Sequence, residues 1–144
     1  MKRNSLFLVL VIVFIFSNCE DKALERRVST FYEIEEDQSL SMEKRHSLLK
    51  RYIVPGKGND SIASFFCKSW EASSEKFRDI DNNILGVEYI ENRQKAIVTT
   101  EDIIESFDGS ETTFISKTIW VYVDGIWYRG HGQSTLYKDG KRIR

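Results

Sequence analysis

The acidic residues of one expected strand are the side chains of this sequence best suited to move a proton. Glu101 and Asp102 stand in the middle of an otherwise apolar stretch, where charge is unusual. A carboxyl that faced inward there, against Lys117, Arg129 or His131, would have a raised pKa and would be able to act as a general base. More often such residues lie on the wet face of a sheet or form a cross-strand ion pair, and the sequence leaves both arrangements open.

The two histidines do not strengthen this chemistry. His131 lies between Gly130 and Gly132 at an expected strand end, where we expect an exposed or structural imidazole, and His46 sits on a charged helix, where we expect it in solvent. Two distant histidines and one usable cysteine offer no metal-ligand spacing. The sequence has no nucleophile elbow, phosphate-binding loop or dinucleotide fingerprint. From motifs alone we therefore predict no catalytic residue, no metal and no cofactor.

The start of the chain has the pattern of a secretion signal. Lys2 and Arg3 give a positive beginning, and Leu6–Phe16 is an unbroken apolar run of eleven residues. As a helix this run spans roughly 16 Å, about half of the hydrocarbon core of a bilayer, which is too short for a stable transmembrane helix. The core of a signal peptide has this length. We therefore assign residues 1–18 to a signal peptide.

The residues Phe16-Ser17-Asn18-Cys19 resemble the lipobox of bacterial lipoproteins. The resemblance implies that the chain is cut before Cys19 and that the Cys19 thiol receives fatty chains, such as palmitate esters of a diacylglycerol. Each buried methylene contributes roughly 0.8 kcal/mol, so two or three chains anchor a protein durably. The implied location is the bacterial cell envelope, with the domain bound to a membrane through its lipid and facing outside the cytoplasm. The alternative is an ordinary cleaved signal in which Cys19 has no special role.

The second cysteine has no partner for an internal disulfide once Cys19 is acylated. Cys67 lies beside Phe65, Phe66 and Trp70 in an apolar helical stripe. We expect a buried thiol that packs as a small hydrophobic side chain.

Length and charge describe one ordinary globular domain. The chain has 144 residues, of which 41% are hydrophobic and 30% charged. Residues 19–144 then make a single domain, with 19–23 as a short tether to the lipid. The formal net charge is −1, and about −3 without Lys2 and Arg3. Because nucleic-acid binding requires a basic surface that neutralises phosphates, we predict no nucleic-acid partner.

Apolar spacing predicts three helices in the first half of the mature chain. The first helix presents one apolar face, made of Leu24, Val28, Phe31 and Tyr32. A second helix is capped by Ser39 or Ser41 and ends at a break rich in proline and glycine. A third helix is capped by Asn59 or Asp60 and keeps helical spacing as far as Ile80.

Further along, the hydrophobic pattern changes from helical to alternating, which predicts strands. The expected ranges are about 85–91, 95–107, 111–123, 126–131 and 134–138. Asn92-Arg93, Asp108-Gly109 and Asp124-Gly125 are short turns between them, and two-residue turns pair strands in antiparallel fashion. Helices that precede a curved antiparallel sheet of four to five strands indicate the α+β class.

One face of the expected strand 111–123 mixes large aromatic with small hydroxyl side chains. The residues on it are Phe114, Ser116, Thr118, Trp120 and Tyr122. Such a face suits the wall of a pocket. The candidate pocket comprises Phe114, Trp120, Tyr122, Asp102 and His131. The alternative is that the aromatic residues simply fill core.

The ten residues Trp120–Arg129, with the sequence Trp-Val-Tyr-Val-Asp-Gly-Ile-Trp-Tyr-Arg, resemble a hairpin of the nuclear-transport-factor-like (cystatin-like) cone fold. The resemblance covers about residues 24–137. It implies N-terminal helices on a curved antiparallel sheet, often with a cavity at the open end. Members of that family include polyketide cyclases, dehydratases and ketosteroid isomerases beside non-catalytic modules, so the fold does not choose the function.

Three functions remain open on the sequence alone. The first, favoured because no acid–base motif matches, is a non-catalytic envelope module that binds a small apolar ligand or a protein partner. The second is a small cone-fold isomerase or dehydratase that acts on an apolar ligand, using Asp102 or Glu101 with Tyr122 or His131. The third is an assembly subunit that forms a homodimer through its sheet.

The lipid anchor predicts the outcome of a labelling experiment. When cells that express the protein are fed a labelled fatty acid, the wild-type protein takes up label and Cys19→Ala does not, because the acyl acceptor is the thiol. Gel fluorography of the purified proteins measures the label. Equal label on both proteins would exclude Cys19 as the anchor.

Overall fold

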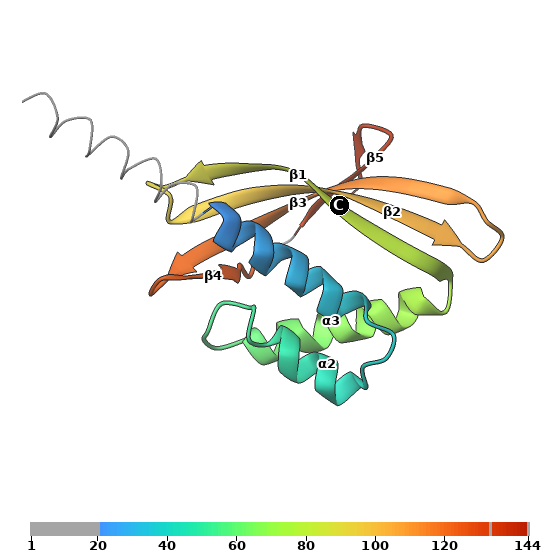
Figure 1. Ribbon diagram of the computed structural model, residues 1–144, viewed down its shortest axis with the longest axis horizontal. Coiled ribbons are helices and arrows are strands. Elements are labelled where there is room, and N and C mark those ends of the chain that lie inside the picture. The colour runs from blue at the N-terminus through green and yellow to red at the C-terminus, as the bar shows by residue number, and fades with distance from the viewer. Residues whose placement is uncertain (1–20, 133, 144) are drawn as a thin grey trace, which may run out of the picture.

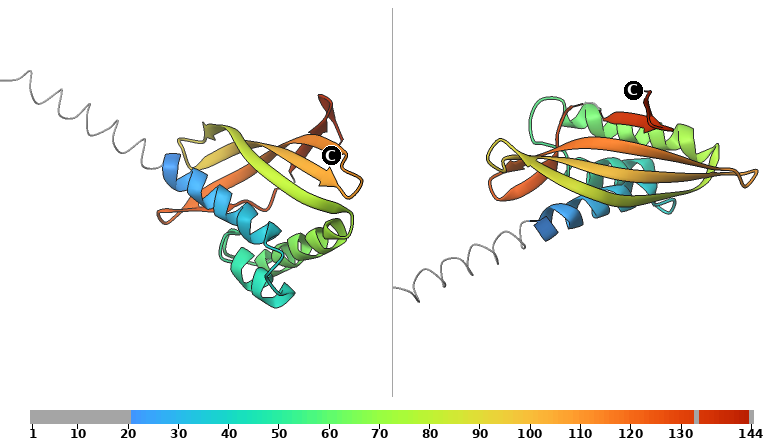
Figure 2. Two further views of the ribbon diagram at one scale, coloured as in Figure 1. Left: turned by 45° about the vertical axis from the view of Figure 1, so that its right-hand side comes forward. Right: turned by 90° about the horizontal axis from the view of Figure 1, so that it is seen from above.

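The computed structural model describes residues 21–132 and 134–143, and in these ranges three helices pack on one side of a six-stranded antiparallel sheet (Figures 1 and 2). The helices span 21–36, Met42–Leu49 (α2) and Asn59–Ser74 (α3). The strands are Phe77–Ile90 (β1), Lys95–Ser106 (β2), Glu111–Val123 (β3), Ile126–Arg129 (β4), Thr135–Lys138 (β5) and Lys141–Arg142 (β6). This is the predicted α+β class, with one strand more than expected.

Strand β3 organises the sheet. β2 pairs with one edge of β3 from end to end, and β1 pairs with the far edge of β2. The other edge of β3 is shared, since β5 pairs with residues 114–117 and β4 with residues 120–123. The main-chain N–H of Gly130 still donates to the carbonyl of Ile119, at 2.8 Å. The chain therefore leaves the sheet after Gly130, and His131 and Gly132 lie outside the pairing.

The core lies between the sheet and the helix at 21–36. Leu24, Val28 and Phe31 are fully buried, which confirms the apolar face expected for this helix. The Phe31 ring meets the Trp120 ring edge-on with centroids 6.0 Å apart, and the Phe66 ring in the same manner at 5.1 Å. One aromatic side chain thus joins the first helix to the sheet and to α3.

Helix α2 closes the far end of this core. The Ser41 hydroxyl caps it, which is one of the two expected caps. Arg45 is fully buried, and its guanidinium carbon lies 3.5 Å from the centre of the Trp70 ring. The guanidinium donates to the main-chain carbonyls of Ile34 and Asp37, where the first helix ends, and the Asp37 carbonyl also accepts from the N–H of Leu40. α2 therefore fixes the C-terminal end of the first helix.

The sequence prediction is wrong at the end of the third helix. α3 ends at Ser74, and Phe77 already begins β1, whereas helical spacing had suggested a helix as far as Ile80. The reason is β2, which is long enough to need a partner along its whole length. Ile80 pairs with Ile104 in that register, so its apolar side chain is equally well placed in a strand.

The predicted cap of α3 is also wrong, because Gly58, with φ +102°, occupies that position and no side chain caps the helix. The Asp60 carboxylate instead accepts from the Lys50 ammonium at 2.8 Å. The turn at Asp124-Gly125 is confirmed as a two-residue hairpin, in which both residues have positive φ.

The signal peptide and Cys19 lie outside the described residues. Of the expected tether, residues 21–23 are helical. No helix in the described ranges is both long and apolar enough to cross a membrane.

The aromatic junction at Phe31 sets an expectation for stability. Phe31→Ala is expected to lower the free energy of unfolding by about 3–5 kcal/mol, because it leaves a cavity between Trp120 and Phe66. Phe107→Ala removes the same phenyl ring at a position that is 67% exposed. This control is expected to change stability by at most about 0.5 kcal/mol. Urea unfolding of the purified proteins measures both, and equal losses would contradict the assignment of Phe31 to the core.

Candidate active site

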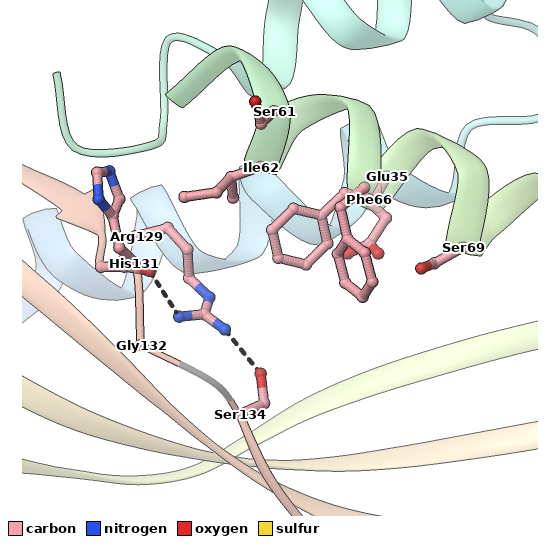
Figure 3. A pocket seen from close by; sticks show the side chains of 11 residues that line it. Glu35, Ser61, Ile62, Phe66, Ser69, Arg129, His131, Gly132 and Ser134 are labelled. Atoms are coloured by element: carbon pink, nitrogen blue, oxygen red, sulfur yellow. Dashed lines mark hydrogen bonds between the residues drawn. The ribbon is translucent and has the colours of Figure 1, made fainter. Parts of the chain in front are cut away.

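A pocket of about 430 Å³ opens between α3, the end of β4 and the segment that leaves the sheet (Figure 3). Its volume lies within the range of roughly 300–1,000 Å³ that small-molecule sites occupy. The residues that line it are Glu35, Ser61, Ile62, Phe65, Phe66, Ser69, Arg129, Gly130, His131, Gly132 and Ser134. α3 supplies an apolar wall, and the other side of the pocket supplies most of the polar groups.

Arg129 is the buried cation of this pocket. It is the last residue of β4 and is only 3% exposed. One guanidinium nitrogen donates to the carbonyls of Ile119 and Gly130, at 3.3 and 3.2 Å. Another donates to the Ser134 hydroxyl at 2.7 Å, and Figure 3 marks this bond with a dashed line. These bonds tie Gly130 and Ser134 to the end of β4, where β-pairing is interrupted. Burial lowers the pKa of Arg129, which remains charged at any pH in the protein's range.

Glu35 is the acid of the pocket. It follows Phe31 by four residues, so it lies on the same buried face of the first helix, where an apolar residue is the norm. No hydrogen bond to its carboxyl is found among the described residues. Burial raises the pKa of Glu35 to about 7, against the opposing effect of the Arg129 charge and with a smaller contribution from Asp102 in the same direction. The carboxyl is therefore partly ionised near neutral pH.

A second cavity, of about 160 Å³, shares Glu35 and Ser69 with the first. Asp102 lines it and accepts hydrogen bonds from the hydroxyls of Thr100, at 3.0 Å, and Ser116. Burial raises the pKa of Asp102 in spite of these bonds. The two cavities therefore adjoin at Glu35, and carboxyl groups line both of them.

Two more groups complete this acidic cluster. Burial, together with the neighbouring Glu35, raises the pKa of Glu36 to about 8. The amide of Asn82 donates to the Glu36 carboxyl across the second cavity. Burial also raises the pKa of Tyr32 to about 12, so its phenol stays protonated. We call Tyr32, Glu35, Glu36 and Asp102 the acidic cluster.

Of the five residues that the sequence proposed for the pocket, two line a cavity in the structure and three do not. Asp102 points to the helix side of the sheet and lines the second cavity, and His131 lines the first. His131 is exposed, and its Nε2 lies 3.1 Å from the carbonyl oxygen of Val54. Glu101 neighbours Asp102 in β2 and therefore faces the opposite side of the sheet. The two candidates for a proton-transfer group are thus separated by the sheet.

The three aromatic candidates line neither cavity. Trp120 is fully buried, and its indole N–H donates to the Thr118 hydroxyl at 3.2 Å. The Tyr122 ring packs on Trp127 with centroids 5.0 Å apart. Phe114 lies towards the other end of β3, with the Lys138 ammonium 5.8 Å from its ring centre. These side chains fill core or cover the sheet.

Sequence reasoning missed Glu35 and Glu36, and it named Arg129 only as a neighbour of Asp102. A signal for Glu35 was present, because it continues the 24, 28, 31 spacing of the first helix. A glutamate on that face has two possible environments. Its side chain either reaches solvent at the end of the helix or is buried in the interior. Only the positions of α3 and of residues 129–132 and 134 decide between the two.

The remaining reactive side chains lie outside the acidic cluster. Cys67 is a buried free thiol, as expected, and burial raises its pKa. His46 is half-buried rather than solvated, and its Nε2 lies 3.2 Å from the main-chain oxygen of Asp60. Within the described ranges, no group of three or more histidine, cysteine and acidic residues is arranged to hold a metal ion.

Comparison with known proteins supports the fold that the site is built on. No family model and no curated protein matches the chain. Among solved structures, the chain is similar to the crystal structure of a "Putative Scytalone Dehydratase" from Novosphingobium aromaticivorans DSM 12444, with 15% identity, a TM-score of 0.54, and coverage of 89% of this chain and 91% of that chain. At this identity the likeness shows the fold alone. The protein therefore has the cone-shaped α+β fold of nuclear-transport-factor-like proteins.

The raised pKa of Glu35 sets the direction of a pH effect. The folded-state pKa is about 7 and the ordinary value is 4.5, so the folded protein keeps a proton that the unfolded chain releases. The stability that this proton confers is complete below pH 4.5 and is lost as the pH rises through about 7.

Glu35→Gln removes this dependence. We expect the free energy of unfolding of Glu35→Gln to increase relative to that of the wild type as the pH rises from 4.5 through about 7. The difference is expected to reach up to about 3 kcal/mol by pH 8. Chemical denaturation at a series of pH values measures the difference. Glu33→Gln, on the exposed side of the same helix, is the control for the loss of a carboxyl. Parallel pH profiles for the wild type and Glu35→Gln would contradict the burial of this acid.

Proposed function

We propose that this protein is a cone-fold acid–base enzyme, a dehydratase or isomerase that acts on a small, mainly apolar molecule. The observation that carries the proposal is Glu35, a carboxyl without a hydrogen-bond partner in the described residues, placed in a pocket between Arg129 and an apolar helix wall. A general base works best when its pKa lies near the working pH, and burial raises the pKa of Glu35 to about 7. The solved dehydratase-like neighbour has the same fold, which is consistent with this chemistry.

The proposal departs from the function that the sequence alone favoured. A non-catalytic module explains an apolar pocket, but it gives no reason to bury several acids together. Glu35, Glu36 and Asp102 each have a raised pKa in a shared interior, which costs stability in the folded protein. Strongly perturbed acids in a cleft are characteristic of sites that transfer protons. The binding module is therefore the second candidate, and it accounts for the apolar wall only.

The proposed reaction uses one proton and one carboxyl. The Glu35 carboxylate takes a proton from a carbon next to a substrate carbonyl, and the electrons of that C–H bond form an enolate. In isomerisation the protonated Glu35 returns the proton to another carbon of the conjugated system. In dehydration it gives the proton to a departing hydroxyl, so that water leaves and a carbon–carbon double bond remains. The positive charge of Arg129 in the same pocket favours the negative intermediate.

The acidic cluster suits such a cycle in a second way. Asp102 and Glu36 lie close to Glu35. An ionised Asp102 raises the pKa of both glutamates, and an ionised Glu35 raises the pKa of Glu36. Tyr32 stays protonated in the same interior, where its phenol is a donor without charge. The cluster therefore holds exchangeable protons close to Glu35 while limiting the number of negative charges at one time.

We also propose that the enzyme is held at a membrane of the cell envelope through a lipid on Cys19. The support is the lipobox-like sequence that precedes the described residues. The first described residue, Asp21, lies two positions after Cys19 in the sequence and is already helical, so few residues separate the proposed anchor from the folded domain.

Catalysis by Glu35 is tested with the purified full-length protein in detergent and a panel of β-hydroxy ketones and β,γ-unsaturated ketones in D₂O. Proton NMR detects loss of water, migration of a double bond or deuterium uptake. We expect turnover that rises as the pH passes through about 7, and a loss of about 100-fold or more in Glu35→Gln. Glu33→Gln is expected to retain the wild-type rate. Turnover that survives Glu35→Gln would exclude Glu35 as the base.

A further inference from the structure

The charge of Arg129 is not neutralised by any acid that it contacts. Its guanidinium nitrogens donate to the carbonyls of Ile119 and Gly130 and to the Ser134 hydroxyl, all of which are uncharged acceptors. No carboxylate within the described ranges forms a salt bridge with it. Glu35 lines the same pocket, and burial raises the pKa of Glu35 in spite of the Arg129 charge. A buried cation without a bonded counter-ion is costly, so the pocket favours an incoming anion.

The rest of the pocket limits what that anion can be. Ile62, Phe65 and Phe66 form the wall that α3 contributes, and Phe65 is 48% exposed although it is a large aromatic residue. The guanidinium carbon of Arg129 lies 5.8 Å from the centre of the Phe66 ring, so the cation and the apolar wall face the same space. A ligand that satisfies both needs an anionic end and an apolar body.

We propose that the pocket takes a small carboxylic acid with an apolar body, and that Arg129 holds the carboxylate. A planar guanidinium matches a carboxylate better than it matches any uncharged oxygen, because two parallel hydrogen bonds form at once. The apolar body then lies along Ile62, Phe65 and Phe66. This inference rests on the proposed function in treating the pocket as the substrate site, and it adds the class of substrate.

Glu35 controls this binding through its protonation state. Its carboxyl lines the same pocket, so an ionised Glu35 repels a second carboxylate and a protonated Glu35 does not. Charged and titratable groups reach Glu35 from four elements and from its own helix. They are Arg129 from β4, Asp102 from β2, Arg45 from α2, Cys67 from α3, and Tyr32 and Glu36 from the first helix. His131 lies on the rim of the pocket. Carboxylate binding is therefore linked to proton uptake.

The test compares two ligands of nearly equal shape, 3-phenylpropanoate and 3-phenylpropanamide, on the wild-type full-length protein in detergent. Isothermal titration calorimetry or ligand-observed NMR at pH 6 gives both dissociation constants. We expect the acid to bind about tenfold tighter than the amide or better, because only the acid pairs with the guanidinium. The advantage is expected to shrink as the pH rises past about 7, where Glu35 ionises. Equal affinities, a preference for the amide, or no binding of the acid at millimolar concentration would overturn the proposal.

Variants of the two charged residues sharpen the test. Arg129→Met keeps the aliphatic stem and removes the charge, and it is expected to abolish the preference for the acid. Because Arg129 also bonds the main chain at Ile119 and Gly130, the affinity of Arg129→Met for the amide shows whether the pocket survives the change. Lys138→Met is the matched control, since it removes an exposed cation that does not line the pocket. Glu35→Gln is expected to retain the preference and to lose its pH dependence. Loss of the preference in Lys138→Met and Arg129→Met alike would indicate that the total charge of the protein, and not the pocket cation, matters.

The outcomes separate this inference from the proposed function. Tight, Arg129-dependent binding of 3-phenylpropanoate with no turnover of any ketone in the panel would support the carboxylate site and contradict the proposed enzyme. Turnover of ketones that Glu35→Gln abolishes, together with equal affinities for the acid and the amide, would support the enzyme and exclude the carboxylate site.

Discussion

The contact between the first helix and the sheet through Phe31 and Trp120 determines where everything else lies. Because Phe31 meets Trp120 and Phe66 together, the helix has one orientation over the sheet and α3 has one position beside it. Glu35, one turn beyond Phe31, is then carried into the space below α3. The same contact that supplies hydrophobic stability therefore also forces an acid away from water, and the raised pKa of Glu35 is a result of packing.

The sheet makes a matching contribution from the other side. A continuous β3 has two short partners on one edge, and His131 and Gly132, which lie between these partners, pair with no strand. Main-chain groups that lose ladder hydrogen bonds need other partners, and Arg129 supplies one to the Gly130 carbonyl. It also gives a second donor to the Ile119 carbonyl, which already accepts from the Gly130 N–H. Placing a cation there solves a structural problem, and it also leaves a positive charge at the wall of the pocket. One side chain thus serves the fold and sets the electrostatics of the site.

The fold was accessible from the sequence because its signals are local. The apolar face at Leu24, Val28 and Phe31 and the turn at Asp124-Gly125 each depend on a few neighbouring residues, and the structure has both. The start of β1 was not accessible in this way, since Phe77 and Ile80 fit a helix or a strand and the choice depends on pairing with β2.

The site was less accessible than the fold, and for the same reason. Asp102 was identified as a candidate, but whether it points inward depends on the register between three strands. Glu35 and Arg129 are distant in sequence, and they share a pocket only because the first helix, α3 and the break in the sheet come together. Aromatic residues such as Trp120 are conspicuous in the sequence, and their size places them in the core.

The first helix has a further consequence as a spacer of fixed length. It is continuous from residue 21 to residue 36. Glu35 follows Asp21 by fourteen residues, which corresponds to roughly 21 Å along the helix axis. If Cys19 carries the proposed lipid, Asp21 lies two residues from the attachment point, and Glu35 lies roughly 21 Å further along the helix axis. In that arrangement a rigid helix, and not a flexible linker, sets most of the distance between the lipid and the pocket.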